Sequence, residues 1–150
     1  MELNDEIRIP APKQVVYDAL NDPNILRQCI PGCEELIQHS PSELEAKVVL
    51  KIGPVKARFA GTVELDQSGA PDGFSLSGEG KGGAAGFAKG GANVTLTEDG
   101  DETILAYTAT ADVGGKIAQL GSRLIKGTAK KLSGAFFKKF AEVVGESVEA

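Results

Sequence analysis

Apolar and polar residues alternate along most of the chain before residue 113, which is the pattern of strands that bury one face. The alternation is clearest in segment 44–53, whose apolar positions are Leu44, Ala46, Val48, Leu50 and Ile52. Turn residues separate this segment from others of the same kind, which are 2–9, 34–39, 55–66, 74–82, 92–99 and 102–112. Because strands joined by short turns pair with one another, the pattern predicts an antiparallel sheet of about seven strands.

The remaining regions have a helical pattern. Segments 11–22 and 24–28 predict two short helices after the first strand, and apolar residues recur with a period near 3.6 from Gly115 to about Glu146. A helix of roughly 30 residues extends about 45 Å. It is the only predicted element large enough to cover the apolar face of the sheet. We therefore expect an α+β fold in which a curved antiparallel sheet wraps around a long C-terminal helix.

The size and composition indicate one soluble domain that spans residues 1–150. The chain has 150 residues, of which 41% are hydrophobic and 25% charged. Its first residues are acidic and lack the apolar core of a signal peptide, and no run approaches the roughly 18 apolar residues of a spanning helix. We expect a cytoplasmic protein without a structural disulfide.

Glycines are concentrated between Gly78 and Gly91, where Gly78, Gly80 and Gly83 match the dinucleotide pattern GxGxxG. That pattern requires a following helix, whereas ANVTLTED, another strand-like segment, follows here. Glycine within strands indicates instead close backbone packing and sheet curvature, or an apolar pocket under the long helix. Both interpretations stay open. For the pocket, the predicted lining residues are Phe59, Gly61, Gly78, Gly80, Phe87, Tyr107, Gly121, Ile125 and Leu132.

The residues of a catalytic or metal site are missing from the sequence. The single histidine, His39, falls in a predicted turn, and Cys29 and Cys33 have neither the spacing nor the second pair of a zinc site. No haem or iron–sulfur motif occurs. We expect no catalytic residues, no metal and no covalently bound cofactor. An enzyme with a hydrophobic substrate would have to use Tyr107 and Asp112.

The charge is distributed unevenly. Seven basic residues and no acidic residue lie between Asp112 and Glu142, so this segment carries +7, whereas the whole chain carries −5. A solvated helix face explains such a segment, and so does contact with an anionic membrane or an acidic partner. The predicted contact residues are Lys116, Arg123, Lys126, Lys130, Phe137 and Lys138. The acidic remainder of the chain and the scarcity of aromatic residues argue against nucleic acid.

Four blocks of sequence resemble the carbon monoxide dehydrogenase G-subunit family, which belongs to the START-like (SRPBCC) helix-grip superfamily. They are LNDPNILRQCIPGCEEL (20–36), KIGPVKARFAGTVEL (51–65), GEGKGGAAGFAKGGANVTL (78–96) and ADVGGKIAQLGSRLIKG (111–127). The resemblance covers nearly the whole chain and agrees with the fold derived above.

The resemblance implies an accessory protein of a molybdenum-containing CO dehydrogenase or a related hydroxylase. It further implies that this protein recruits the enzyme to the cytoplasmic membrane, with which it associates peripherally. A hydrophobic ligand, such as a quinone or lipid, is expected between sheet and helix. Two alternatives remain: a cyclase- or hydratase-like enzyme that acts on a hydrophobic molecule, and a pure protein–protein adaptor with a packed interior. Neither the ligand, nor the partner's substrate, nor the oligomeric state follows from the sequence.

Overall fold

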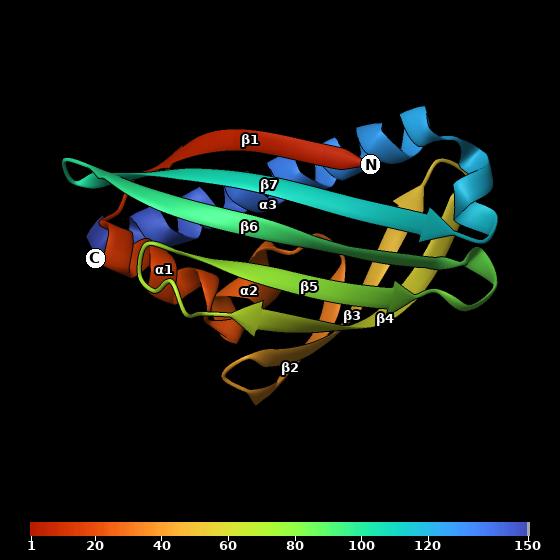
Figure 1. Ribbon diagram of the computed structural model, residues 1–150, viewed down its shortest axis with the longest axis horizontal. Helices are drawn as coiled ribbons and strands as arrows, with labels where there is room; N and C mark the ends of the chain where they lie inside the picture. The colour runs from red at the N-terminus through yellow and green to blue at the C-terminus, as the bar shows by residue number, and fades with distance from the viewer. Residues whose placement is uncertain (150) are drawn as a thin grey trace.

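The computed structural model describes residues 1–149 and contains one sheet, two short helices and one long helix (Figure 1). The strands are β1 (Glu2–Ile9), β2 (Cys33–Ser40), β3 (Glu43–Ile52), β4 (Val55–Asp66), β5 (Gly73–Lys81), β6 (Phe87–Asp99) and β7 (Glu102–Gly114). The helices are α1 (Lys13–Leu20), α2 (Pro23–Cys29) and α3 (Ser122–Glu149), with 3₁₀ turns η1 (Gly83–Ala85) and η2 (Lys116–Leu120).

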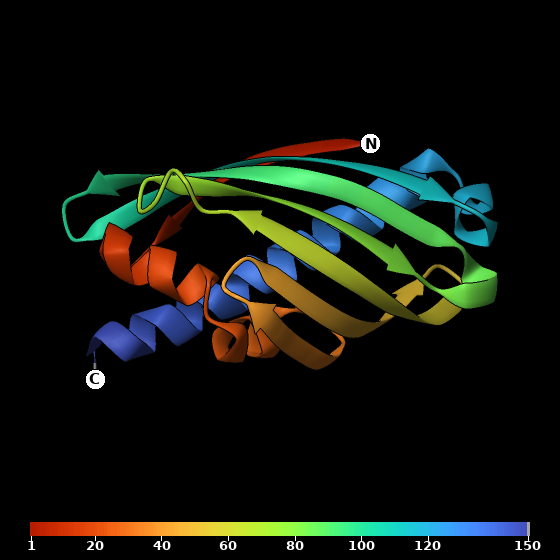
Figure 2. The same ribbon diagram turned by 60° about the horizontal axis from the view of Figure 1, so that its bottom comes forward.

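The sheet is antiparallel throughout, with the strand order β1-β7-β6-β5-β4-β3-β2. It curves over α3, and α1 and α2 lie under the sheet beside the helix (Figure 2). The predicted fold is therefore confirmed: seven antiparallel strands, two short helices after the first strand, and a long C-terminal helix.

The predicted start of the long helix is wrong by seven residues. Residues Lys116–Leu120 form the 3₁₀ turn η2, and α3 begins at Ser122. Gly121 joins them with a φ of +93°, a left-handed conformation that glycine adopts without the steric cost other residues incur. Lys116 consequently lies on η2 rather than on the long helix.

The main hydrophobic core occupies one end of the molecule, which we call the filled half. Here α1 and the C-terminal part of α3 pack under the sheet, and the largest completely buried side chains include Ile9, Val16, Leu105, Phe140 and Val144. A smaller cluster of Ile52, Phe59, Ala85 and Ile117 lies toward the other end. We call that end, with the N-terminal part of α3, the hollow half.

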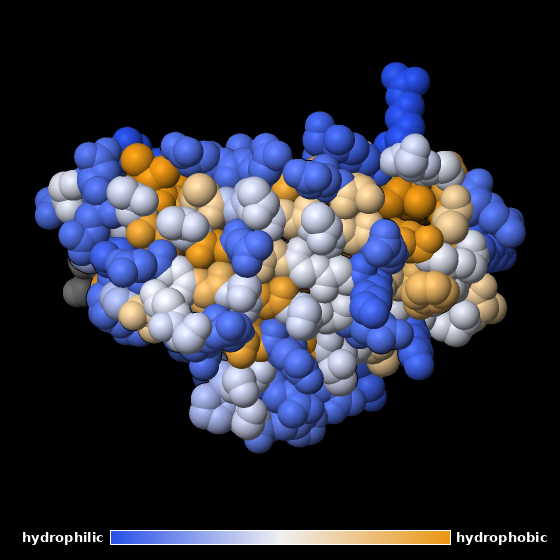
Figure 3. Space-filling model, in the orientation of Figure 1, coloured by the Kyte–Doolittle hydropathy of each residue, from blue (hydrophilic) through white to orange (hydrophobic). Residues whose placement is uncertain are grey.

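The opposite face of the sheet is solvent-exposed. In the view of Figure 3 it is a mixture of hydrophilic and weakly apolar residues, with separate hydrophobic patches. Alternation along the strands explains this surface, because consecutive side chains point to opposite faces of a sheet.

Candidate functional site

A row of small residues crosses the inner face of the sheet in the hollow half. The register aligns five neighbouring residues on β3 to β7: Ala46, Gly61, Gly80, Ala88 and Val113. The adjacent inward row is also small over β5 to β7, where it consists of Gly78, Gly90 and Ala111. The sheet therefore contributes little side-chain volume at this place.

Helix α3 does not fill the space left by these rows. Its large side chains at this level are Ile125 and Leu132, and the half-buried residues between them, Thr128 and Ala129, are small. A cavity of about 400 Å³ remains between sheet and helix. Ligand sites in proteins measure roughly 300–1,000 Å³, so the space suits a small molecule.

The cavity wall is almost entirely apolar. It is lined by Ile30, Pro31, Ala46, Val48, Leu50, Ile52, Phe59, Gly61, Thr62, Val63, Gly78, Glu79, Gly80, Ala88, Val113, Ile117, Ile125 and Leu132. Thr62 and Glu79 are exposed and alternate with inward-facing neighbours, so their side chains belong to the outer face. A bound molecule would be recognised by shape and apolar contact.

Six of the nine residues predicted to line a pocket do line this cavity: Phe59, Gly61, Gly78, Gly80, Ile125 and Leu132. Both interpretations of the glycines apply, at different positions. A Cβ on Gly61 would lie 2.5 Å from the Glu79 carbonyl oxygen, so this glycine permits close strand packing. A Cβ on Gly80 would meet only the Phe59 Cβ, at 4.0 Å, so this glycine leaves open space.

The other three predicted lining residues lie elsewhere. Phe87 has the opposite parity to the inward Ala88, and its 45% exposed ring lies against Gly114 on the outer face. Tyr107 points inward but stacks on Phe137, with ring centroids 5.3 Å apart, away from the cavity. Gly121 is exposed and connects η2 to α3.

A second depression adjoins the cavity along one flank of α3. This groove of about 1,000 Å³ runs between α3 and the ends of β2 and β3, and it shares Pro31, Leu50 and Leu132 with the cavity wall. Three basic residues, Lys51, Arg123 and Lys131, also line it. Of these three, only Arg123 is among the predicted contact residues. Lys131 is not among them, and Lys51 and the Ile30–Gly32 turn lie too far from α3 in the chain to give a joint sequence signal.

The predicted contact residues are divided between the two flanks of α3. Arg123 lines the groove, whereas Lys130 and Lys138 line another depression beside β1, together with Tyr107 and Phe137. Lys116 and Lys126 are exposed. Phe137 is half-buried by its stacking on Tyr107, so it is a weaker contact residue than predicted.

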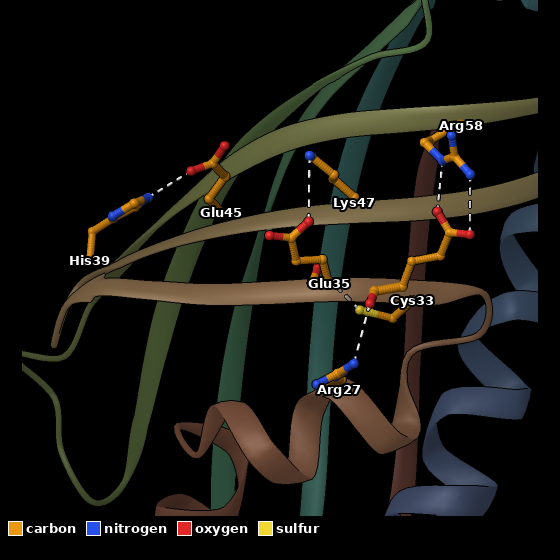
Figure 4. Close-up of polar contacts among 8 residues, drawn as sticks. Arg27, Cys33, Glu35, His39, Glu45, Lys47 and Arg58 are labelled. Atoms are coloured by element: carbon orange, nitrogen blue, oxygen red, sulfur yellow. Dashed lines mark hydrogen bonds and ion pairs between the residues drawn. The ribbon is translucent and has the colours of Figure 1, made fainter.

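Polar contacts cross the outer face of β2, β3 and β4 (Figure 4). Arg58 donates to both carboxylate oxygens of Glu34, at 2.7 and 3.3 Å, and Lys47 lies 3.4 Å from Glu35. These pairs connect the edge strand β2 to the sheet from outside.

His39 and the two cysteines do not form a reactive group in the described chain. The predicted turn position of His39 is wrong: this residue lies on strand β2, where it pairs with Glu45 at 2.7 Å on the exposed face. Cys29 and Cys33 are free thiols, and burial raises the pKa of both, which disfavours the thiolate. Within residues 1–149 no group of three or more His, Cys, Asp or Glu side chains is placed to hold a metal ion.

Tyr107 and Asp112, the pair considered for an enzyme, lie on opposite faces of β7. Tyr107 alternates in step with the buried Leu105, so its side chain faces inward. Asp112 is exposed and out of step with them, so its side chain faces outward. They do not form a common site.

Comparisons with known proteins agree with this architecture. Residues 6–145 match the CoxG family, the G-subunit of carbon monoxide dehydrogenase. A conserved protein from Geobacillus kaustophilus has a similar crystal structure, with 32% identity, a TM-score of 0.92, and coverage of 98% of this chain and 97% of that chain. No curated protein matches the sequence.

More distant structures share the fold. A START superfamily protein from Mycobacterium smegmatis is 14% identical with a TM-score of 0.75, covering 97% of each chain. The Zhui aromatase/cyclase from Streptomyces sp. R1128 is 12% identical with a TM-score of 0.71, covering 99% of this chain and 95% of that chain. The fold is therefore START-like.

Proposed function

This chain belongs to the CoxG family of carbon monoxide dehydrogenase, and we propose that it is a non-catalytic accessory protein that carries a hydrophobic ligand for a molybdenum-containing CO dehydrogenase-type enzyme. The observation that supports this function best is the apolar cavity between the sheet and α3. The ligand in this proposal is an isoprenoid quinone or another lipid. A quinone would supply redox chemistry that the apolar side chains of the wall lack.

The exposed basic residues give the carrier a reversible contact with an anionic membrane. Arg123, Lys126, Lys130 and Lys138 project from α3, and each basic residue close to such a surface contributes about 1 kcal/mol. Among the described helices, none has the length and apolar character needed to cross a bilayer.

A cyclase- or hydratase-like function is less well supported. Distant structures with this fold include an aromatase/cyclase, but such chemistry needs polar groups at the substrate, and within residues 1–149 no polar side chain faces the cavity. A pure adaptor is also disfavoured, because a packed interior would not leave about 400 Å³ empty.

The cavity is tested by filling it. Ala88 lines the cavity on β6, so Ala88→Leu places three additional carbon atoms inside it. Ala60→Leu makes the same change on the exposed outer face of β4 and is the matched control. Native mass spectrometry after mild extraction from the producing cells should find a quinone or lipid on the wild type and on Ala60→Leu, but not on Ala88→Leu. A protein that never carries a ligand, or an Ala88→Leu variant that retains it, would contradict the carrier function.

The membrane contact is tested separately with Lys126→Glu/Lys130→Glu. The fraction of this variant that sediments with vesicles of anionic phospholipid at low salt should be much smaller than that of the wild type. The control Lys81→Glu/Lys89→Glu makes the same charge change on the exposed outer face of β5 and β6. Its sedimented fraction should decrease much less. Equal binding by all three proteins would rule out this membrane contact.

A further inference from the structure

The groove beside α3 combines two properties that occur together nowhere else among the depressions described above. It adjoins the cavity through Pro31, Leu50 and Leu132, and it is lined by basic residues. No acidic side chain of residues 1–146 lines it, and none of the ion pairs in that range involves Lys51, Arg123 or Lys131. Within that range these basic residues are therefore not paired with a carboxylate.

The depression on the other flank of α3 provides an internal comparison. It also has two basic residues, Lys130 and Lys138, but Asp5 lines it as well. It shares no lining residue with the cavity. Of these two depressions, only the groove therefore brings basic residues next to the cavity wall.

Leu124 covers part of the boundary between solvent and groove. It is 39% exposed, and its Cδ2 would lie 2.8 Å from a Cβ on Gly53. Leu124 therefore packs against the β3–β4 turn at Gly53 and adds an apolar side chain to the groove wall.

We propose that the groove is a head-group site for an amphiphile that carries a carboxylate or another anionic group, with its apolar chain in the cavity. The inference rests on the proposed function, since it requires a hydrophobic ligand, and among the ligands proposed there it selects a lipid with an anionic group over a neutral quinone. Arg123 and Lys131 come from α3, whereas Lys51, at the end of β3, is exposed and has the outward parity. An anionic oxygen in the groove can approach the two cations of the helix, while the apolar wall removes the chain from water.

The charges lie at the surface, so their effect is moderate and sensitive to salt. Each exposed ion pair contributes little by itself. With the two cations of α3 we expect an anionic ligand to bind about tenfold more tightly than its neutral counterpart at low ionic strength. At about 1 M salt, where the Debye length is roughly 3 Å, most of this preference should disappear.

The experiment compares laurate with 1-dodecanol, which have chains of the same length but different head groups. Each is titrated, below its aggregation concentration, as a competitor of a fluorescent apolar probe bound to the protein. The proteins are the wild type, Arg123→Gln/Lys131→Gln, and the control Lys81→Gln/Lys89→Gln, which loses the same charge on the exposed outer face. Circular dichroism checks that all three are folded.

We expect the wild type and the control to prefer laurate about tenfold, and the groove variant to bind both compounds within about twofold of each other. Equal affinity of the wild type for laurate and dodecanol would overturn the head-group site. So would a preference that survives in the groove variant.

A third competitor, the neutral quinone analogue decylubiquinone, separates this inference from the proposed function. If it displaces the probe and laurate has no advantage, the hydrophobic carrier stands and the anionic head-group site fails. A probe that binds the wild type but not Ala88→Leu occupies the cavity. If laurate, dodecanol and the quinone all fail to displace such a probe, the carrier function itself fails.

Discussion

The two halves of α3 lie under the same sheet but present side chains of different size. From Phe136 onward the helix buries Phe140 and Val144 completely, and the Phe136 and Phe140 rings stack with centroids 5.8 Å apart. Before Phe136 the inward positions are Ile125 and Leu132, with small residues between them. The strands change in the same sense, from Phe74 and Leu96 in the filled half to Gly80 and Ala88 in the hollow half.

This difference shows how a small domain maintains an empty interior. Atoms that line a void lack contacts on one side and lose the dispersion energy of those contacts. The filled half therefore has to supply most of the packing energy that keeps the sheet and helix together. In the hollow half, surface ion pairs such as Arg58–Glu34 add to the backbone pairing of β2, β3 and β4.

The largest contrast should come from shortening one side chain of α3 in each half. Phe140→Ala removes a completely buried ring and should lower the free energy of unfolding by about 3–5 kcal/mol. Leu132→Ala enlarges a cavity that already exists, so we expect less than the roughly 2 kcal/mol that a packed leucine costs. Urea denaturation of both variants measures the two values. Similar losses would show that the halves are equally well packed.

Enlarging an alanine should have opposite effects in the two halves. Ala19 is 5% exposed in the core around α1, so Ala19→Leu should destabilise by about 1–3 kcal/mol through overpacking. Ala88→Leu extends into free space and should leave stability unchanged or raise it by up to about 2 kcal/mol. Thermal unfolding distinguishes these outcomes. Destabilisation of Ala88→Leu by more than about 1 kcal/mol would mean that the space near β6 is too small for a ligand group.

The halves should also differ in how much a threonine hydroxyl contributes to the free energy of unfolding. In the filled half, Thr103 is completely buried and donates a 2.7 Å hydrogen bond to the carbonyl oxygen of Ala11. Thr103→Val leaves that carbonyl without its donor and should cost about 1–3 kcal/mol. Thr103→Ser keeps the donor and serves as the control. It should lose less, by the contribution of one methyl group.

Thr128 is the counterpart in the hollow half. Its hydroxyl donates to the Leu124 carbonyl oxygen at 2.9 Å, which is a bond within one turn of α3. The helix backbone satisfies that carbonyl as well, so Thr128→Val should change stability by no more than about 0.5 kcal/mol. A loss equal to that of Thr103→Val would contradict the contrast.

The sequence predicted the fold and part of the cavity for identifiable reasons. Alternation located all seven strands but began β6 five residues late, at Ala92 rather than Phe87. The alternating residues Phe59, Gly61, Gly78 and Gly80 do line the cavity. Phe87 does not, because its parity along β6 is opposite to that of the inward-facing Ala88. Along β7 the parity of Tyr107 was correct, but only the register shows that it lies opposite Phe137 rather than the small row.

The groove could not be predicted, because it depends on which segments the fold brings together. Lys51, Arg123 and the turn at Pro31 are distant in sequence and meet only where the β3–β4 turn approaches the start of α3. Likewise, the apolar residues keep a period near 3.6 on both sides of Gly121. This pattern gives no indication that the backbone changes direction at that glycine.

The smallest expected effect concerns the ion pairs of the hollow half and depends on pH. The Arg58 guanidinium, through its hydrogen bonds and its charge, lowers the pKa of Glu34 from its ordinary value. The folded state therefore binds this proton more weakly than the unfolded state. The stabilisation is complete above the ordinary glutamate pKa of about 4.3, and it is lost as the pH falls through the lower pKa of the folded state.

Glu34→Gln removes this titration while keeping the side-chain shape. Urea denaturation should show the variant slightly less stable than the wild type at pH 7, with a difference that shrinks as the pH falls below the ordinary glutamate range. Glu64→Gln, on the same outer face but in none of the ion pairs formed by residues 1–149, is the matched control for the removed charge. The difference in the free energy of unfolding between Glu34→Gln and the wild type could instead stay constant from pH 7 to below the glutamate range. That result would mean that Arg58 does not stabilise the folded hollow half through this carboxylate. In that case strand β2 would be held by its backbone pairing with β3, its contact with α2 and the Lys47–Glu35 pair.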